Sequence, residues 1–337
     1  MKKGFKLSNL VSVIIVVALM LAIVVMLFIT MTTNGDDSTD ALKRTSDQSI
    51  YNFLILGRDS AAGLCDMIML GSINTDRGDV NFLQIPRDTY FNCSDGNYKK
   101  INGAYNSLGS AKAFSEELER ALGIKIDYYL SFNLDTVAQI VDTVKGIKVK
   151  VPFDMDYEDP AQNLSIHLKK GEQELDGKEA IQFLRYRSGY VTGDLGRIDA
   201  QKLFLNSFAK RIIEIGNPFA LYNVFRLICN KGETNLREQD LISIGLKCAK
   251  THGGGVYYMT APGEAVQSDI SGAWYYILSA SSNSKILSER FGMSEIFDKD
   301  NKFVDKNAKT FFDIYNKSCE VRIYTADEID KNEININ

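Results

Sequence analysis

The sequence predicts an α/β domain, with a central mixed sheet flanked by helices, behind a single N-terminal transmembrane helix. An uncharged segment near the N-terminus is long enough to cross a bilayer. Beyond it, runs of β-branched and aromatic residues alternate with segments of helical periodicity, the pattern of a layered α/β domain. Neither an internal repeat nor a change in composition divides the rest of the chain, so we expect one domain.

The N-terminal segment has the properties of a membrane anchor. Residues 10–31, LVSVIIVVALMLAIVVMLFITM, carry no charge. As a helix they would span roughly 33 Å, enough for a hydrocarbon core of about 30 Å. Lysines precede the segment and aspartates follow it, so the positive-inside rule places residues 1–9 in the cytoplasm and the bulk of the chain outside. A cleaved signal peptide is the alternative, but the apolar run is long for one and lacks an A-x-A-like cleavage site. We therefore expect a single-pass protein of the cell membrane, with residues 32–50 as a polar linker.

The acidic balance of the chain argues against a nucleic-acid partner. The formal net charge is −4 at pH 7. Because residues 1–9 hold three lysines and no acidic residue, the remainder of the chain carries −7. A nucleic-acid-binding domain would be net basic. Clusters of arginine within so acidic a domain indicate a site for a small anionic ligand instead.

The cysteines and histidines form no recognisable zinc or nucleophile motif. The chain has five cysteines and two histidines, without a C-x-x-C pair or a G-x-S-x-G sequence. We expect the cysteines to be small buried residues, with one disulfide, Cys229–Cys248, as the alternative outside the cell.

Strand and helix patterns alternate along residues 51–292, which we assign to an extracytoplasmic domain. Strands are expected at residues 52–56, 67–73, 80–85, 127–132 and 147–152, and helices at 111–122, 134–144, 176–186 and 197–215. The sequence NTDRGD, residues 74–79, is typical of a hairpin turn between the second and third strands. Residues 293–337 are rich in Lys, Asp and Asn, and we expect a polar C-terminal tail there with one short helix at 308–316.

Four charged residues are expected at one edge of the sheet. Asp59 follows the first strand, Asp66 opens the second, and Arg87 and Asp88 follow the third. The hairpin makes the second and third strands antiparallel, so the third strand ends at the edge where Asp66 lies. If the first two strands are also antiparallel neighbours, Asp59 joins them. Crowded carboxylates favour a hard divalent cation, Mg²⁺ or Mn²⁺. The alternative is turn aspartates with solvated charges.

The stretch RYRSGYVTGDLGR, residues 185–197, contains three arginines that would repel one another without an anion between them. Arg185 and Arg187 would point apart on a continuous helix, so they converge only if the helix ends near Arg185, where SGYVTG provides a break. Arg197 falls in the first turn of the next helix, where an anion would be bound by the helix N-terminus and the guanidinium together, with Gln201 on the same face. The alternative is that the arginines pair with acidic residues of the chain, namely Glu179, Asp194 and Asp199.

Taken together, these segments resemble the LytR-CpsA-Psr family of cell-envelope phosphotransferases. The resemblance covers residues 52–292 through NFLILGRDS, CDMIMLGSIN, LQIPRDTY, KINGAYNSLG, LGIKIDYYLSFN, VDTVKGIKVKVP, KKGEQELDGKEAIQFLRYR, GDLGRIDAQ and GAWYYILS. It implies an α/β fold with a deep apolar pocket for a polyprenyl chain. It also implies transfer of a glycopolymer, such as wall teichoic acid or capsule, from a polyprenyl-pyrophosphate carrier in the membrane to peptidoglycan, with formation of a phosphodiester.

The resemblance also implies roles for individual residues. Asp59 and Asp66 match the aspartates near Mg²⁺, or Mn²⁺ in its place, and Asp66 matches the base for the acceptor hydroxyl. The residues that match the pyrophosphate-binding set are Arg87, Arg185, Arg187, Arg197 and Gln201. The residues expected to be catalytic are Asp66, Arg87, Arg185 and Arg187.

Some positions depart from the family pattern. Leu64 and Ala61 stand where arginine is usual, Ala200 replaces a further arginine, and Lys202 stands where glutamine is common. Arg58 is adjacent and could replace a lost cation. These departures motivate one alternative function, a catalytically degenerate polyprenyl-phosphate-binding protein of the envelope. A second alternative is a transcriptional attenuator, as the family was once labelled.

Overall fold

The structure is a computed structural model that describes residues 48–59, 63–94, 96, 99–160, 164–215, 218–248, 251 and 253–331. The predicted transmembrane helix and nearly all of the predicted linker lie outside these residues. Among the helices that are described, none combines the length and the apolar character needed to cross a membrane.

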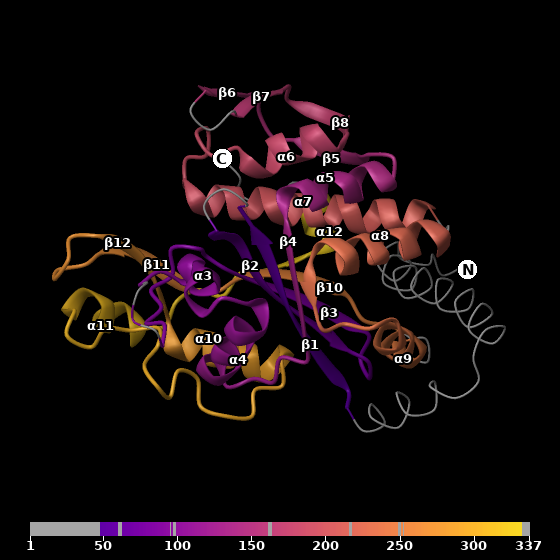
Figure 1. Ribbon diagram of the computed structural model, residues 1–337. Helices are drawn as coiled ribbons and strands as arrows, with labels where there is room; N and C mark the ends of the chain where they lie inside the picture. The colour runs from indigo at the N-terminus through magenta and orange to yellow at the C-terminus, as the bar shows by residue number, and fades with distance from the viewer. Residues whose placement is uncertain are drawn as a thin grey trace, which may run out of the picture.

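A seven-stranded mixed sheet forms the centre of the domain, in the order β13-β10-β3-β2-β1-β4-β9 (Figure 1). The strands are β1 (Ile50–Arg58), β2 (Cys65–Asn74), β3 (Asp79–Ile85), β4 (Tyr128–Asn133), β9 (Glu233–Thr234), β10 (Val256–Thr260) and β13 (Ile323–Thr325). The predicted hairpin joins β2 to β3, and β1 pairs antiparallel with β2, as the sequence argument required. Since β4 is parallel to β1 and β10 is parallel to β3, the carboxyl ends of β1, β3, β4 and β10 meet the start of β2 at one edge.

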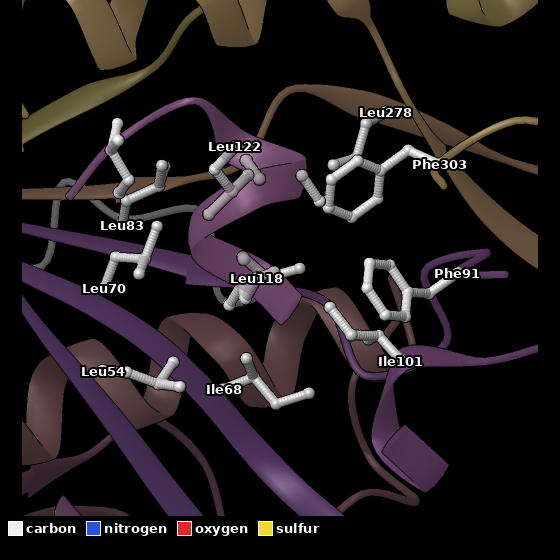
Figure 2. Close-up of a cluster of buried hydrophobic side chains, with 14 of the residues drawn as sticks. Leu54, Ile68, Leu70, Leu83, Phe91, Ile101, Leu118, Leu122, Leu278 and Phe303 are labelled. Carbon is white, nitrogen blue, oxygen red and sulfur yellow. The ribbon is translucent and has the colours of Figure 1, made fainter. Parts of the chain in front are cut away.

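One face of the sheet packs against three helices, α3 (Ala104–Leu108), α4 (Ala111–Leu122) and α10 (Ala280–Arg290) (Figure 1). Figure 2 shows Leu118 and Leu122 of α4 lying over leucine and isoleucine side chains of the central strands. These strand residues are fully or almost fully buried: Leu54, Ile68, Leu70 and Leu83. Each such side chain contributes about 1.5–3 kcal/mol by leaving water, which makes this layer the main core. Helix α4 ends where predicted, because Gly123 adopts φ 67°.

The other face carries helices that include α5 (Leu134–Thr143), α6 (Gly177–Arg185), α7 (Asp194–Ile215), α8 (Pro218–Lys231) and α9 (Glu238–Cys248). Two hairpin-like pairs cover α6 and α7 from outside: β5 (Ile147–Val151) with β8 (Gly171–Leu175), and β6 (Met155–Asp159) with β7 (Leu164–Leu168). A capping box begins α6, since the Asp176 side chain accepts from the Glu179 amide and the Glu179 side chain accepts from the Asp176 amide.

Residues 293–331 pack into the fold, whereas the sequence predicts a polar tail there. Strand β13 extends the central sheet by pairing antiparallel with β10, and the predicted short helix is present as α11 (Lys309–Tyr315). Phe303, Phe311 and Ile329 are at most 2% exposed. Helix α12 (Ala326–Asp330) is joined to α7 by the Asn206 amide, which donates to Ala326 O and Asp330 Oδ1. The segment is also rich in Lys, Asp and Asn, which is why its composition suggests a polar tail.

The remaining strands, β11 (Gly263–Gln267) and β12 (Trp274–Leu278), form a separate hairpin. None of the five cysteines is in a disulfide, so the Cys229–Cys248 pair is absent, and Cys65, Cys93 and Cys248 are buried.

Candidate active site

The charged residues predicted at one sheet edge do come together there. Asp66 lies at the start of β2, and Arg87 follows β3 through Pro86. The Arg87 Nη1 donates to Asp66 Oδ1 at 2.5 Å. The antiparallel pairing of β2 with β3 explains this contact, because it places the start of one strand beside the end of the other.

Asp59 lies at the same edge, next to the end of β1. Its backbone N–H donates to Leu64 O at 2.9 Å, and Gly63 N–H donates back to Asp59 O at 3.0 Å, which closes a tight loop between β1 and β2. The register of these strands shifts after the Gly57–Met67 pair, so Asp66 is the extra residue of a bulge. Asp59 and Asp66 both line the cavity described below.

The two carboxylates suit a divalent cation only in company with other ligands. Within the described residues, no group of three or more His, Cys, Asp or Glu side chains is placed to hold a metal ion. Mg²⁺ commonly binds proteins through one or two carboxylates and takes its other ligands from water and substrate phosphates. The donor set of Asp59 and Asp66 therefore fits Mg²⁺ beside a phosphorylated ligand, and does not fit a closed protein site.

The arginine stretch breaks between two helices as predicted. Helix α6 ends at Arg185, and Tyr186 leaves it in an extended conformation. Gly193 then adopts φ 60°, which suits glycine, and α7 begins at Asp194, three residues before the predicted start at 197. The side chains of Arg185, Arg187 and Arg197 consequently line one cavity although they belong to different local conformations.

Asp194 is an anion that lies close to Arg187 and Arg197 of this stretch and to Arg87. Its Oδ1 is 2.8 Å from Arg197 Nη2, 3.4 Å from Arg87 Nε and 4.0 Å from Arg187 Nε. This part of the alternative interpretation is confirmed. The other two acidic residues have different partners, since Asp199 pairs with Lys202 and Glu179 completes the capping box.

The cluster holds more positive than negative charge, and several of its buried polar atoms lack hydrogen bonds. Within the described residues these atoms are both carboxylate oxygens of Asp194, Nε of Arg87, and Nε and Nη2 of Arg197. A buried polar group without a partner costs about 1–3 kcal/mol. An oxygen-rich anion would satisfy the guanidinium donors, so the cluster is arranged to accept a ligand.

Burial and neighbouring charges act differently on the two inner arginines. Burial alone would lower the pKa of Arg87, but Asp194 and Asp66 outweigh it and raise that pKa above its ordinary value. Burial lowers the pKa of Arg197, opposed by Asp194 and assisted by the nearby Arg87. A guanidinium remains a permanent cation in either case, so both residues are fixed positive charges at this site.

A cavity of about 510 Å³ opens at this cluster and continues into the apolar layer above the sheet. Charged and polar residues, including Arg58, Asp66, Arg187 and Gln201, lie at its polar end. Its apolar walls come from β2, β4, α5, α7 and α8, and include Met67, Phe132, Val137, Phe204, Phe208 and Ile228. A second, almost wholly apolar cavity of about 230 Å³ lies closer to the N-terminal ends of β1 and β4 and is lined there by Ile55 and Leu130.

Arg87 and Gln201, both predicted to bind pyrophosphate, differ in their position relative to the cavity. Arg87 is not among the residues lining the cavity in the described part of the chain, and instead contacts the lining residues Asp66 and Asp194 from behind. Gln201 does line the cavity, and its Oε1 accepts a hydrogen bond from the Gln84 amide.

Two of the departures from the expected pattern, Ala200 and Lys202, are buried. Ala200 is 1% exposed in the core, and Lys202 is buried with its Nζ donating to Asp199 Oδ1 at 2.8 Å and Thr260 Oγ1 at 2.7 Å. Cys65, beside Asp66, is buried as well, and burial raises its pKa to about 12, which makes it a poor nucleophile. Ala61 lies outside the described residues.

Fold and site together define an α/β domain whose apolar cavity opens at an arginine cluster, which suits an amphiphile with an anionic head group. The chain belongs to the LytR_cpsA_psr family, whose model matches residues 25–291.

Relatives with assigned names support this membership. The polyisoprenyl-teichoic acid–peptidoglycan teichoic acid transferase TagV of Bacillus subtilis is 31% identical over 223 residues, which cover 60% of this chain and 57% of TagV. The TagU transferase of Bacillus licheniformis is 28% identical over 76% of this chain and 82% of its own length. The crystal structure of B. subtilis TagV matches with a TM-score of 0.61 and 26% identity, over 74% of this chain and all of that one. A structure of TagT bound to LI-WTA shares the fold, with a TM-score of 0.55 and 20% identity over 76% of this chain and 92% of that one.

Proposed function

We propose that this protein transfers an anionic glycopolymer from a polyprenyl-pyrophosphate carrier to peptidoglycan, forming a phosphodiester. The observation that carries the proposal is the opening of an apolar cavity at a cluster of arginines with unsatisfied donors. The names of the TagV and TagU relatives, which describe transfer of teichoic acid from a polyisoprenyl carrier to peptidoglycan, support the same reaction.

The carrier lipid would bind with its hydrocarbon chain in the apolar cavity and its pyrophosphate at the polar end. Arg185, Arg187 and Arg197 line that end and donate to phosphate oxygens, and the Gln201 amide adds a neutral donor. Phosphoryl transfer depends mainly on positioning and on neutralising charge on the phosphate oxygens, and fixed guanidinium groups provide both.

Asp66 would accept the proton of the acceptor hydroxyl on peptidoglycan. Its carboxylate is 34% exposed at the cavity and is oriented from behind by Arg87. The hydroxyl oxygen then forms a bond to the phosphorus that bears the glycopolymer, the bridging P–O bond breaks, and polyprenyl monophosphate leaves. Arg87 thus acts as a positioning residue, because it contacts Asp66 and Asp194 rather than the cavity.

Asp59 and Asp66 would hold Mg²⁺, or Mn²⁺, together with the pyrophosphate. Such an ion would neutralise charge on the phosphate oxygens during transfer. The anchor would be residues 10–31, which would place the domain on the outer side of the cell membrane, beside both the lipid carrier and the peptidoglycan.

Reconstitution tests the proposal directly. The full-length chain in liposomes would be mixed with lipid-linked glycopolymer, nascent peptidoglycan and Mg²⁺, and covalent product would be measured. Asp66→Ala should lower the transfer rate by about 10²–10³-fold, because it removes both a metal ligand and the proton acceptor. Asp76→Ala, at an exposed turn position far from the site, is the matched control and should leave the rate unchanged.

Two outcomes would contradict the proposal. Wild-type transfer by Asp66→Ala would remove the assigned chemistry. Tight binding of the lipid carrier without any covalent product would favour the degenerate lipid-binding function, which the departures at Leu64 and Ala200 motivate.

A further inference from the structure

Arg58 is a cation at the cavity for which the proposed transfer has no role. It is the last residue of β1 and lines the cavity from the sheet side. The arginines Arg185, Arg187 and Arg197 line it from the side of α6 and α7. The polar end of the cavity therefore has positive charge on two walls.

Arg58 differs from the arginines of the Asp194 cluster in its partners. Within the described residues it forms no ion pair with a carboxylate, and its buried Nε has no hydrogen-bond partner. Its guanidinium carbon lies 4.8 Å from the centre of the Tyr105 ring instead. An aromatic face attracts a guanidinium without using its N–H donors, which lie in the guanidinium plane. Arg58 is thus held in place while its donors remain available.

Tyr105 is held in position by a hydrogen bond to Glu233. Its hydroxyl donates to Glu233 Oε2 at 3.0 Å, and Glu233 also accepts from the Ala111 amide at the start of α4. Arg58, Tyr105 and Glu233 come from β1, α3 and β9, so three elements position one guanidinium. A solvated surface arginine would need no such support.

We propose that Arg58 binds the second phosphate of a lipid diphosphate and makes the cavity select diphosphate over monophosphate esters of the same lipid. This inference rests on the proposed function. Arg185, Arg187 and Arg197 bind one phosphate from the cavity wall formed by α6 and α7. Arg58 binds the other phosphate from the wall formed by β1. A lipid monophosphate, the product of the transfer, cannot reach both walls at once, so it is bound more weakly and released.

Binding of two short isoprenyl esters tests this assignment. Geranyl diphosphate and geranyl monophosphate would be titrated by calorimetry into the full-length chain in nanodiscs, with Mg²⁺ held constant. Arg58→Gln should weaken diphosphate binding by about tenfold to a hundredfold, the loss expected for a charged hydrogen bond, and change monophosphate binding by less than about threefold. Arg77→Gln, a half-exposed arginine at the β2–β3 turn, is the control and should bind both esters like the wild type.

Variants of Tyr105 test whether its ring positions the Arg58 guanidinium, as distinct from a general loss of folded structure. Tyr105→Phe keeps the ring beneath Arg58 and should retain the preference for diphosphate, whereas Tyr105→Leu removes the ring and should reduce it. Circular dichroism would show that each variant is folded.

The possible results distinguish the inference from the function on which it rests. If Arg58→Gln binds both esters like the wild type, or loses both equally, the assignment of Arg58 is overturned while the proposed function stands. If the wild type binds neither ester, or Arg187→Gln binds the diphosphate as well as the wild type does, the proposed function fails too.

Discussion

Asp194 Oδ1 lies 2.8 Å from Nη2 of Arg197, one turn later on the same helix, yet the two groups do not form a hydrogen bond. The same carboxylate lies within 4.0 Å of the guanidinium groups of Arg87 and Arg187. One carboxylate therefore lies close to three cations, and buried donors of two of them, Arg87 and Arg197, have no hydrogen-bond partner.

Asp194→Asn should make the stability of the folded protein depend more strongly on an anion bound at the arginine cluster. Removing the charge leaves three neighbouring cations, one of them almost fully buried, and should lower the free energy of unfolding by about 1–3 kcal/mol. Inorganic pyrophosphate should restore more stability to this variant than to the wild type, because it replaces the missing negative charge. Thermal unfolding with and without pyrophosphate measures both effects. Equal stabilisation of the two proteins would contradict the prediction.

Arg187→Ala and Arg197→Ala should separate binding from stability. The Arg187 side chain is 53% exposed and the Arg197 side chain is 4% exposed, although both lie near Asp194. Arg187→Ala should reduce transfer by about 10²–10³-fold and lower the free energy of unfolding by less than about 1 kcal/mol. Arg197→Ala should reduce transfer and also cost about 3 kcal/mol, because Asp194 loses its nearest partner. Urea unfolding and the transfer assay, run on the same preparations, would check the contrast.

Phe311→Ala and Phe312→Ala test whether the segment after residue 292 is part of the core. The two residues are neighbours on α11, but Phe311 is 2% exposed and Phe312 is 45% exposed. Phe311→Ala should lower the free energy of unfolding by about 3–5 kcal/mol, and Phe312→Ala by less than about 1 kcal/mol. Similar small effects for both variants would indicate that the segment behaves as a tail.

Asp298 should make stability depend on pH in the mildly acidic range. Burial raises the pKa of this carboxyl from 3.8 to about 6, although it accepts hydrogen bonds from the Lys302 and Phe303 amides. The folded state therefore binds the proton more tightly than the unfolded state. Protonation of Asp298 therefore contributes fully to the free energy of unfolding below pH 3.8, and this contribution is lost as the pH rises through about 6.

Asp298→Asn removes this titration and provides the measurement. The free energy of unfolding of the wild type, relative to the variant, should fall by up to about 3 kcal/mol between these two pH values. Urea unfolding of both proteins at several pH values would give this difference. A constant or rising difference would contradict the assignment of the raised pKa.

The local elements of this fold could be predicted because their signals lie within a few residues of one another. The hairpin turn between β2 and β3 and the alternation of apolar residues in those strands fix their antiparallel pairing. From that pairing alone, Asp66 and Arg87 were expected to meet, and they do. The end of α6 at Arg185 was also predictable, because the convergence of Arg185 and Arg187 required it.

Other parts of the site could not be predicted, because they depend on contacts between segments distant in the sequence. Asp194 was considered only as a partner of nearby arginines, and its contact with Arg87 joins residues more than a hundred positions apart. Arg58 is held by Tyr105, which in turn is held by Glu233, and no sequence spacing links these three residues.

By itself the sequence determined the class of fold, the sheet edge at which Asp59, Asp66 and Arg87 gather, and the arginine set of residues 185–197. Periodicity, turns and caps are local properties, and they are sufficient for these features. Only the tertiary structure decided that β13 joins the sheet beside β10, that one carboxylate serves three arginines, and that Arg58 lies over an aromatic ring at the cavity. Those features follow from the packing of distant segments, where burial and charge are set by the whole domain.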